Sequence, residues 1–191
     1  MKNNMENYSK NYIKDLNDSL IKIDPKKLEL MAKKLWEVKL NNNTVFLLGN
    51  GGSSATPSHS SGDWSKELEL KATCLSDNTP NVTALANDTD YDNIFLGQLR
   101  IFLSKNDLVI GYSGSGNSAN VINAVKYARD KGNFVIGLTG NYKNGKGGML
   151  KANSDLSIVV NSTSMERIED SHLIINHIVK KYVKDNYLHT L

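Results

Sequence analysis

Short apolar runs alternate with longer amphipathic segments along this chain of 191 residues. The runs are short and rich in Val, Ile and Leu, which is typical of buried strands. Five of them are predicted strands, at residues 45–48, 73–75, 108–112, 134–139 and 156–160. Helical patterns lie between or after them, at 55–68, 82–86, 92–103, 119–131 and 165–187. Strands that alternate with helices predict a doubly wound α/β fold, with a five-stranded parallel sheet flanked by helices.

The N-terminal part of the chain is predicted to be helical before the first strand begins. Apolar residues recur at helical spacing over 8–40, and Pro25 divides this region into two helices because proline interrupts a helix interior. Asp24 is suited to cap the second helix. Since no Pro-rich or Ser-rich linker divides the chain, 1–191 is predicted to be a single domain, with helices in 1–42 and the core in 43–191.

Two loops rich in Gly, Ser and Asn follow predicted strands, at 49–54 and 111–118. Each precedes a helical pattern, and Ser53 or Ser54 is placed to cap the helix over 55–68. Such a loop presents backbone N–H groups, hydroxyls and a helix N-terminus to one point, which suits a phosphate. One such loop alone is equally well explained as a plain turn. A turn needs Gly or Asn, however, and it does not need Ser113, Ser115 and Ser118 together.

The two loops match neither common nucleotide-binding motif. No Gly-Lys-Ser/Thr sequence follows either loop, and neither has the Gly-x-Gly-x-x-Gly fingerprint, so ATP and NAD are not expected. Hydroxyls without a lysine suit a phosphomonoester that is bound but not transferred. Because both loops follow strands of a parallel sheet, we expect one small phosphorylated ligand at the carboxyl edge of that sheet.

Composition narrows the classes of partner further. A formal net charge of +3 is too small to indicate nucleic acid, and basic pairs such as Lys180 and Lys181 are interpreted as solvated helix faces. No apolar stretch has the length of a membrane span, and the N-terminal residues lack the apolar core of a signal peptide. The lone Cys74 excludes an internal disulfide and fits a reducing compartment. We therefore expect a cytoplasmic protein that binds neither nucleic acid nor membrane.

Several motifs, in the same order along the chain, resemble the sugar isomerase (SIS) domain family. The resemblance covers about residues 40–185 and rests on Gly49-Asn50-Gly51-Gly52-Ser53 with His59, on Ala86-Asn87-Asp88, on 113–121, on 137–140, and on 167–172 with His177. With both histidines present, the chain is similar to the phosphoheptose isomerases, which interconvert sedoheptulose 7-phosphate and D-glycero-D-manno-heptose 7-phosphate. The resemblance implies the flavodoxin-like SIS fold, a phosphorylated sugar as substrate, and a product used for surface polysaccharide.

The resemblance also implies how the substrate is bound and how the protein assembles. The phosphate ligands would be Ser53, Ser113, Ser115 and Ser118, the serines of the two loops. Further substrate contacts would come from Asn50, Gly51, Gly52, Asn87, Asp88, Asn120 and Glu169. The implied assembly is a homotetramer with active sites at subunit interfaces, in which the N-terminal helices of 1–42 take part.

A metal and a catalytic set are implied as well. The family places a His and a carboxylate four residues apart, here His59 and Asp63, and a Gln and a His eight residues apart, here Glu169 and His177. These four would bind Zn²⁺, with Asp63 as base, Glu169 as a second candidate base, and His177 as acid and base. Asp63 is one methylene shorter than the family's Glu, and Glu169 replaces the family's Gln. Two carboxylates with two imidazoles would leave the zinc formally neutral and a weaker Lewis acid.

Helix geometry separates two members of this set. Eight residues correspond to a rise of about 12 Å, too far for Glu169 and His177 of one helix to share a metal, so we expect them to come from different subunits. Glu169 and His172 form a closer pair, although His172 is expected to be a satisfied interfacial or core histidine. His189 is expected to be disordered. Two alternative functions stay open: a non-catalytic SIS protein that regulates or binds a replication initiator, and an isomerase of a related sugar phosphate.

Overall fold

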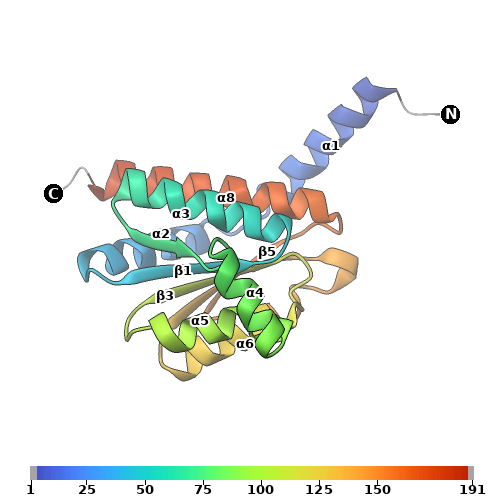
Figure 1. The fold of residues 1–191 in the computed structure, drawn as a ribbon. Coiled ribbons are helices and arrows are strands. Elements are labelled where there is room, and N and C mark those ends of the chain that lie inside the picture. Colours follow the sequence, from blue (N-terminus) through green and yellow to red (C-terminus); the bar gives the residue numbers. More distant parts are fainter. Residues whose placement is uncertain (1–3, 189–191) are drawn as a thin grey trace.

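The computed structural model describes residues 4–188, and the expectation about His189 lies outside them. Within these residues a five-stranded parallel sheet forms the centre of the molecule, with the order β2-β1-β3-β4-β5 (Figure 1). The strands are β1 (Thr44–Gly49), β2 (Lys71–Cys74), β3 (Leu108–Ser113), β4 (Phe134–Gly140) and β5 (Leu156–Val160). The predicted doubly wound α/β fold is confirmed, and every strand begins and ends within two residues of its predicted position.

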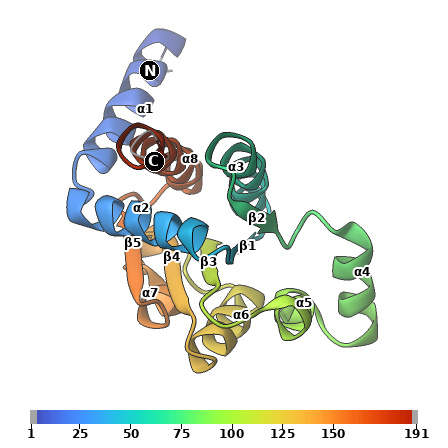
Figure 2. The same cartoon turned by 90° about the vertical axis from the view of Figure 1, so that its left-hand side faces the viewer.

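Helices cover both faces of the sheet (Figure 2). They are α1 (Met5–Leu20), α2 (Pro25–Leu40), α3 (Gly52–Leu68), α4 (Thr79–Asp88), α5 (Ile94–Phe102), α6 (Ala119–Asp130), α7 (Gly148–Ala152) and α8 (Met165–Asn186). Alternating side chains of β1 divide the core in two, since Val45 and Leu47 pack with α2, α3 and α8. Phe46 and Leu48 pack on the opposite face with α5 and α6. Because both faces are covered, the central strands β1, β3 and β4 are buried over nearly their whole length, whereas the edge strand β2 is largely exposed.

The helix after the first Gly/Ser loop begins earlier than predicted. α3 starts at Gly52, and its N-cap Gly51 has a φ of +55° and makes no side-chain capping bond. The prediction that Ser53 or Ser54 caps this helix is therefore wrong. A positive φ is open to glycine at little cost, so Gly51 turns the chain directly from β1 into α3. As a result Ser53 lies in the first turn of the helix.

Two further differences concern short segments with weak periodicity. α4 is longer than predicted because Asn78 caps it, accepting from the Asn81 N–H, and Pro80 occupies its first turn. α7 is absent from the sequence prediction, because a helix of five residues is too short to display a helical period.

The N-terminal helix extends away from the body of the molecule (Figure 1). The exposed apolar side chains of α1 include Met5, Tyr8 and Ile13. The Tyr12 hydroxyl joins α1 to α8 by donating to Asp170 at 2.6 Å. α2 begins as predicted, with the Asp24 carboxylate accepting from the backbone N–H two residues later. Within residues 4–188 no helix combines the length and apolar character needed to cross a membrane.

Candidate active site

The two Gly/Ser loops meet at the carboxyl edge of the sheet. β1 and β3 are neighbours in parallel register, with Gly49 opposite Tyr112, so the loops that follow them emerge side by side. Together with the start of α8 they form a pocket of about 220 Å³. It is lined by Asn50, Gly51, Gly52, Ser53, Tyr112, Ser113, Gly114, Ser115, Ser118, Met165 and Glu169. No lysine or arginine is among these lining residues, so hydroxyls and backbone N–H groups are its donors. We call it the serine pocket.

The serines of the second loop lie close together. Ser113 Oγ is 3.1 Å from Ser118 Oγ and 3.4 Å from Ser115 Oγ. The Gly116 N–H donates to Ser113 Oγ, and the Asn117 N–H donates to Ser115 Oγ. These backbone bonds orient the oxygens, and the three hydroxyls, which pair with one another, can turn their protons toward a bound acceptor. With Ser53 at the start of α3, the arrangement suits an anion such as a phosphate.

Glu169 also lines the serine pocket, against the first loop. A Cβ atom at Gly52 would overlap the Glu169 carboxylate, so the missing side chain of Gly52 makes room for it. Burial raises the pKa of the Glu169 carboxyl above its ordinary value, and the negative charges of Glu166 and Asp170 raise it further. A carboxyl group that holds its proton more readily than usual therefore stands beside the predicted phosphate site.

Asn50 and Asn120 form a reciprocal amide pair. Each side-chain nitrogen donates to the oxygen of the other at 2.9 Å, and the Tyr91 hydroxyl donates to Asn50 at 3.1 Å. Asn120 is buried and does not line the serine pocket, so it supports Asn50 from behind the first loop. Asn87 and Asp88 lie exposed at the end of α4, where the Asn87 amide donates to Asp88, and they do not line the pocket either.

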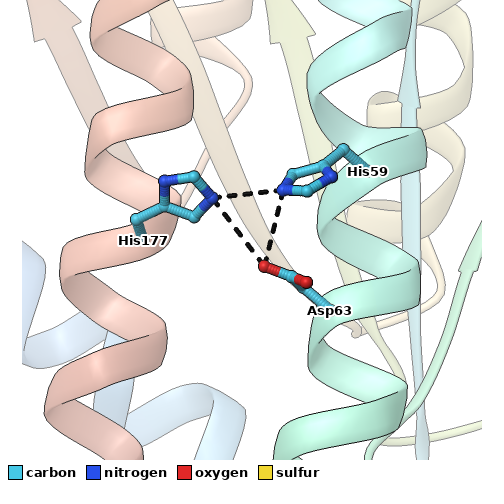
Figure 3. Close-up of side chains that lie close together, drawn as sticks. All are labelled: His59, Asp63 and His177. Atoms are coloured by element: carbon cyan, nitrogen blue, oxygen red, sulfur yellow. Dashed lines mark hydrogen bonds and ion pairs between the residues drawn. The ribbon is translucent and has the colours of Figure 1, made fainter.

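Three other predicted residues form a separate cluster between α3 and α8 (Figure 3). His59 and Asp63, four residues apart on α3, face His177 on α8. The two Nε2 atoms lie 3.2 Å apart. Asp63 Oδ2 lies 3.5 Å from His59 Nε2 and 3.7 Å from His177 Nε2. We call these three residues the His–Asp–His cluster.

The His–Asp–His cluster fits a tetrahedral metal ion. Zinc bonds of about 2.0–2.1 Å place neighbouring ligands about 3.3–3.4 Å apart in a tetrahedron. The three separations in the cluster, 3.2, 3.5 and 3.7 Å, are close to that value. Three protein ligands leave a fourth position for water or substrate, as in catalytic zinc sites. The side chains present could therefore hold a zinc ion.

Glu169 is not part of this cluster. It lies eight residues before His177 on α8 and lines the serine pocket instead, as the helical rise predicts. The predicted four-ligand set is therefore not assembled within one chain, in keeping with the expectation that Glu169 and His177 of one site come from different subunits. The neutral zinc implied by all four ligands stays a prediction. One carboxylate and two neutral imidazoles would leave zinc with a charge of about +1, which favours Lewis-acid chemistry.

His172 is a core histidine, as expected, but it is not fully satisfied by hydrogen bonds. It is fully buried, and its Nε2 lies 3.3 Å from the Thr139 carbonyl oxygen. Burial lowers the pKa of His172 to about 4, so the ring is neutral at physiological pH. Nδ1 has no hydrogen-bond partner among the described residues. No group of three potential metal ligands within residues 4–188 includes His172.

Lys180, which is not among the site residues predicted from the sequence, contacts the cluster directly. Its ammonium lies 2.6 Å from Asp63 Oδ2 and 2.9 Å from Glu67 Oε1, and its side chain is only 15% exposed. The interpretation of Lys180 as part of a solvated face is therefore wrong, whereas its neighbour Lys181 is 71% exposed. The hydrogen bond from Lys180 is the largest cause that lowers the pKa of Asp63. The available signal was spacing, since Lys180 follows His177 by three residues and Glu67 follows Asp63 by four.

The chain is similar to known proteins over most of its length. A family model described as SIS domain matches residues 8–140. A phosphoheptose isomerase from Aliarcobacter butzleri is 37% identical over 167 residues, covering 85% of this chain and 86% of that protein. Another, from Aneurinibacillus thermoaerophilus, is 36% identical, with coverages of 83% and 80%. The solved phosphoheptose isomerase from Neisseria gonorrhoeae superposes with a TM-score of 0.85 at 29% identity, covering 94% of this chain and 98% of that one. The chain therefore belongs to the SIS domain family and is a homologue of phosphoheptose isomerases over most of its length.

Proposed function

We propose that this protein is an aldose–ketose isomerase that converts D-sedoheptulose 7-phosphate to D-glycero-D-manno-heptose 7-phosphate, which would supply heptose for a surface polysaccharide. The observation that carries the proposal is the presence of two polar sites along the same pair of helices. The serine pocket lies at the start of α3 and α8, and the His–Asp–His cluster lies farther along both helices. The curated relatives named above support the choice of substrate class.

The serine pocket would anchor the phosphate of the substrate. Ser53, Ser113, Ser115 and Ser118 supply hydroxyls, and the first turn of α3 supplies backbone N–H groups. Because no cation lines the pocket, nothing there stabilises the charge that builds up when a phosphoryl group is transferred. The phosphate would therefore serve as a handle that positions the sugar, and Asn50, Gly51 and Gly52 would border it.

The proposed reaction moves two protons and leaves the rest of the sugar unchanged. A base takes a proton from C1 of the ketose, which gives an enediolate between C1 and C2. The proton returns to C2, while the O1 proton moves to O2, so that the carbonyl passes from C2 to C1. His177, whose side chain is exposed on α8, is the proposed carrier of this proton between the two oxygens.

Two carboxylates are candidates for the base. Lys180 donates a hydrogen bond to Asp63 and lowers its pKa, which makes Asp63 a weaker base. Glu169 has a raised pKa and lies in the serine pocket, so we assign the base to Glu169. A substrate anchored among the serines has to bend for its C1 to approach Glu169 of the same chain. Glu169 of a second subunit imposes no such bend, in keeping with an active site between subunits.

The metal and the assembly complete the proposal. His59, Asp63 and His177 would hold Zn²⁺, which when bound polarises the sugar carbonyl and stabilises the enediolate. We also propose a homotetramer in which the N-terminal helices contribute to the interfaces. The exposed Met5, Tyr8 and Ile13 of α1 support this, because apolar side chains on a protruding helix favour burial against another subunit.

The test is turnover of sedoheptulose 7-phosphate by the purified full-length protein, with and without added zinc. We expect activity in the wild type and loss of about a hundredfold or more in Glu169→Gln and in His177→Ala. Asp185→Asn removes an acid on the same helix that pairs with the exposed Lys181, and it is the matched control. Full turnover by Glu169→Gln would refute the assignment of the base.

One observation favours a second function, the binding of a phosphosugar without turnover. The ion pair between Lys180 and Asp63 neutralises the carboxylate at the position where the family has its catalytic Glu. Saturable binding of sedoheptulose 7-phosphate, together with no turnover at any zinc concentration, would select this second function over the isomerase.

A further inference from the structure

A ladder of charged and polar side chains runs along the contact between α3 and α8. On α3 the side chains are His59, Asp63 and Glu67, each four residues after the last, and on α8 they are His177, Lys180 and Lys184. His177 faces His59 and Asp63, and Lys180 bridges Asp63 and Glu67. Lys184 contacts the other oxygen of Glu67, Oε2, at 3.0 Å. Each carboxylate of the ladder therefore has a cationic partner.

Asp63 Oδ2 is the oxygen that Lys180 and the two histidines share. It accepts from the Lys180 ammonium at 2.6 Å, and it is also the oxygen nearest to the Nε2 atoms of both histidines. A divalent cation bound to the His–Asp–His cluster would need the electron pairs of this same oxygen. It would also place two positive charges beside the ammonium in a partly buried site, where like charges repel more strongly than in water. The cation and the ammonium therefore compete for one atom.

Glu67 is a second anionic partner for the Lys180 ammonium. Lys180 already contacts Glu67 Oε1 at 2.9 Å, so it can give up Asp63 without losing every anionic partner. We propose that Lys180 competes with a divalent cation for Asp63. Glu67, because it can hold Lys180 away from Asp63, then controls how strongly this competition lowers the affinity of the site for the cation. Lys180 and Glu67 are then positioning residues that tune metal affinity. This inference rests on the proposed metal site.

The experiment measures Co²⁺ binding to the metal-stripped full-length protein, from the visible absorption of tetrahedral cobalt and by titration calorimetry at one pH. Lys180→Met removes the competitor and should tighten cobalt binding by about tenfold or more, within the range by which partners of metal ligands alter affinity. Lys181→Met is the matched control, since it removes the same charge from the next residue of α8, whose side chain is exposed and pairs with Asp185. Its affinity should stay within about twofold of the wild type.

Glu67→Gln supplies a change in the opposite direction. With its second partner neutralised, Lys180 depends on Asp63 alone, so cobalt binding should weaken by several-fold. His59→Ala should abolish the tetrahedral spectrum, which ties the signal to this site. Circular dichroism and thermal unfolding of each variant establish that it is folded.

Three results would overturn the inference: equal cobalt affinities for Lys180→Met and Lys181→Met, tighter binding by Glu67→Gln, or no cobalt binding by any variant. The last result would also remove the proposed metal site. If cobalt binds as expected and sedoheptulose 7-phosphate is not turned over, the inference stands and only the proposed reaction fails.

Discussion

The carboxylate of Glu169 occupies the space that a side chain at Gly52 would need. This contact connects the start of α3 to the start of α8 across the serine pocket. Four serines line the pocket, and no lysine or arginine is among its lining residues. A carboxylate in that place repels a second negative charge. Burial raises the pKa of Glu169, and the negative charges of Glu166 and Asp170 raise it further. The affinity of the pocket for an anion should therefore depend on whether Glu169 carries its proton.

The first prediction concerns the pH dependence of anion binding. Sulfate remains a dianion over the pH range in which the protein can be studied. Its binding to the wild type should therefore strengthen as the pH falls through the raised pKa of Glu169, because the carboxylate takes up a proton there. Glu169→Gln should bind sulfate about tenfold more tightly at neutral pH and show little pH dependence in that window. Titration calorimetry at a series of pH values measures both. A wild-type affinity that stays flat, or falls, on acidification contradicts the prediction.

The second prediction concerns Gly52→Ala. The added methyl group would overlap the Glu169 carboxylate, so the carboxylate has to move and disturb the first loop. We expect the sulfate affinity to fall by about tenfold, as expected when close-packed groups are displaced. With Glu169→Ala as the background the overlap is absent, so adding Gly52→Ala should change the sulfate affinity by less than about twofold relative to Glu169→Ala alone. A tenfold loss in that background as well would show that the overlap is not the cause.

The third prediction concerns Gly62, which lies inside α3 next to Asp63. A Cβ atom added there meets nothing within 4 Å, and Gly62 is exposed. Gly62→Ala should therefore raise the free energy of unfolding by about 0.5–1 kcal/mol, because alanine loses less backbone entropy in a helix. Urea unfolding monitored by circular dichroism measures the change. A destabilised Gly62→Ala variant would show that the glycine has a role beyond helix propensity.

The fourth prediction concerns acid sensitivity of the α3–α8 contact. Hydrogen bonds from Lys180 are the largest cause that lowers the pKa of Asp63, and with Lys184 they lower the pKa of Glu67 to about 2. Carboxyl groups with lowered pKa values stabilise the folded state above their ordinary pKa, and this contribution is lost as the pH falls toward the lowered values. Wild-type stability should therefore decrease between about pH 5 and about pH 2.

Lys180→Met removes the main cause of both shifts, so its urea midpoint should decrease less over that pH interval than the midpoint of the wild type. Lys181→Met should follow the wild type, since Lys181 contacts neither carboxylate. Identical pH profiles for Lys180→Met and the wild type would show that the ion pair between Lys180 and Asp63 does not contribute to stability.

The strands, the two loops and the boundaries of the long helices could be predicted because they depend on short-range patterns. A buried strand needs a continuous apolar run, and Pro25 with Asp24 marks the start of α2 whatever the rest of the chain does. α7 was not predicted, because five residues are too few to display a helical periodicity. The full length of α4 was not predicted either, because its N-cap, Asn78, lies outside the apolar pattern. The cap of α3 was predicted wrongly because Gly51 adopts a positive φ in place of a side-chain cap.

The amino-acid sequence alone indicated the serine loops from their composition and their places after strands, and its resemblance to the SIS family implied His59, Asp63, Glu169 and His177. It placed the serines together, and it separated Glu169 from His177 by the rise of one helix. The tertiary structure assigned the partners: Asp63 and Lys180 are 117 residues apart and meet only because α3 packs against α8, and Glu169 meets Gly52 for the same reason. Such contacts depend on how the sheet brings together two helices that are distant in the sequence. A local sequence pattern therefore cannot predict them.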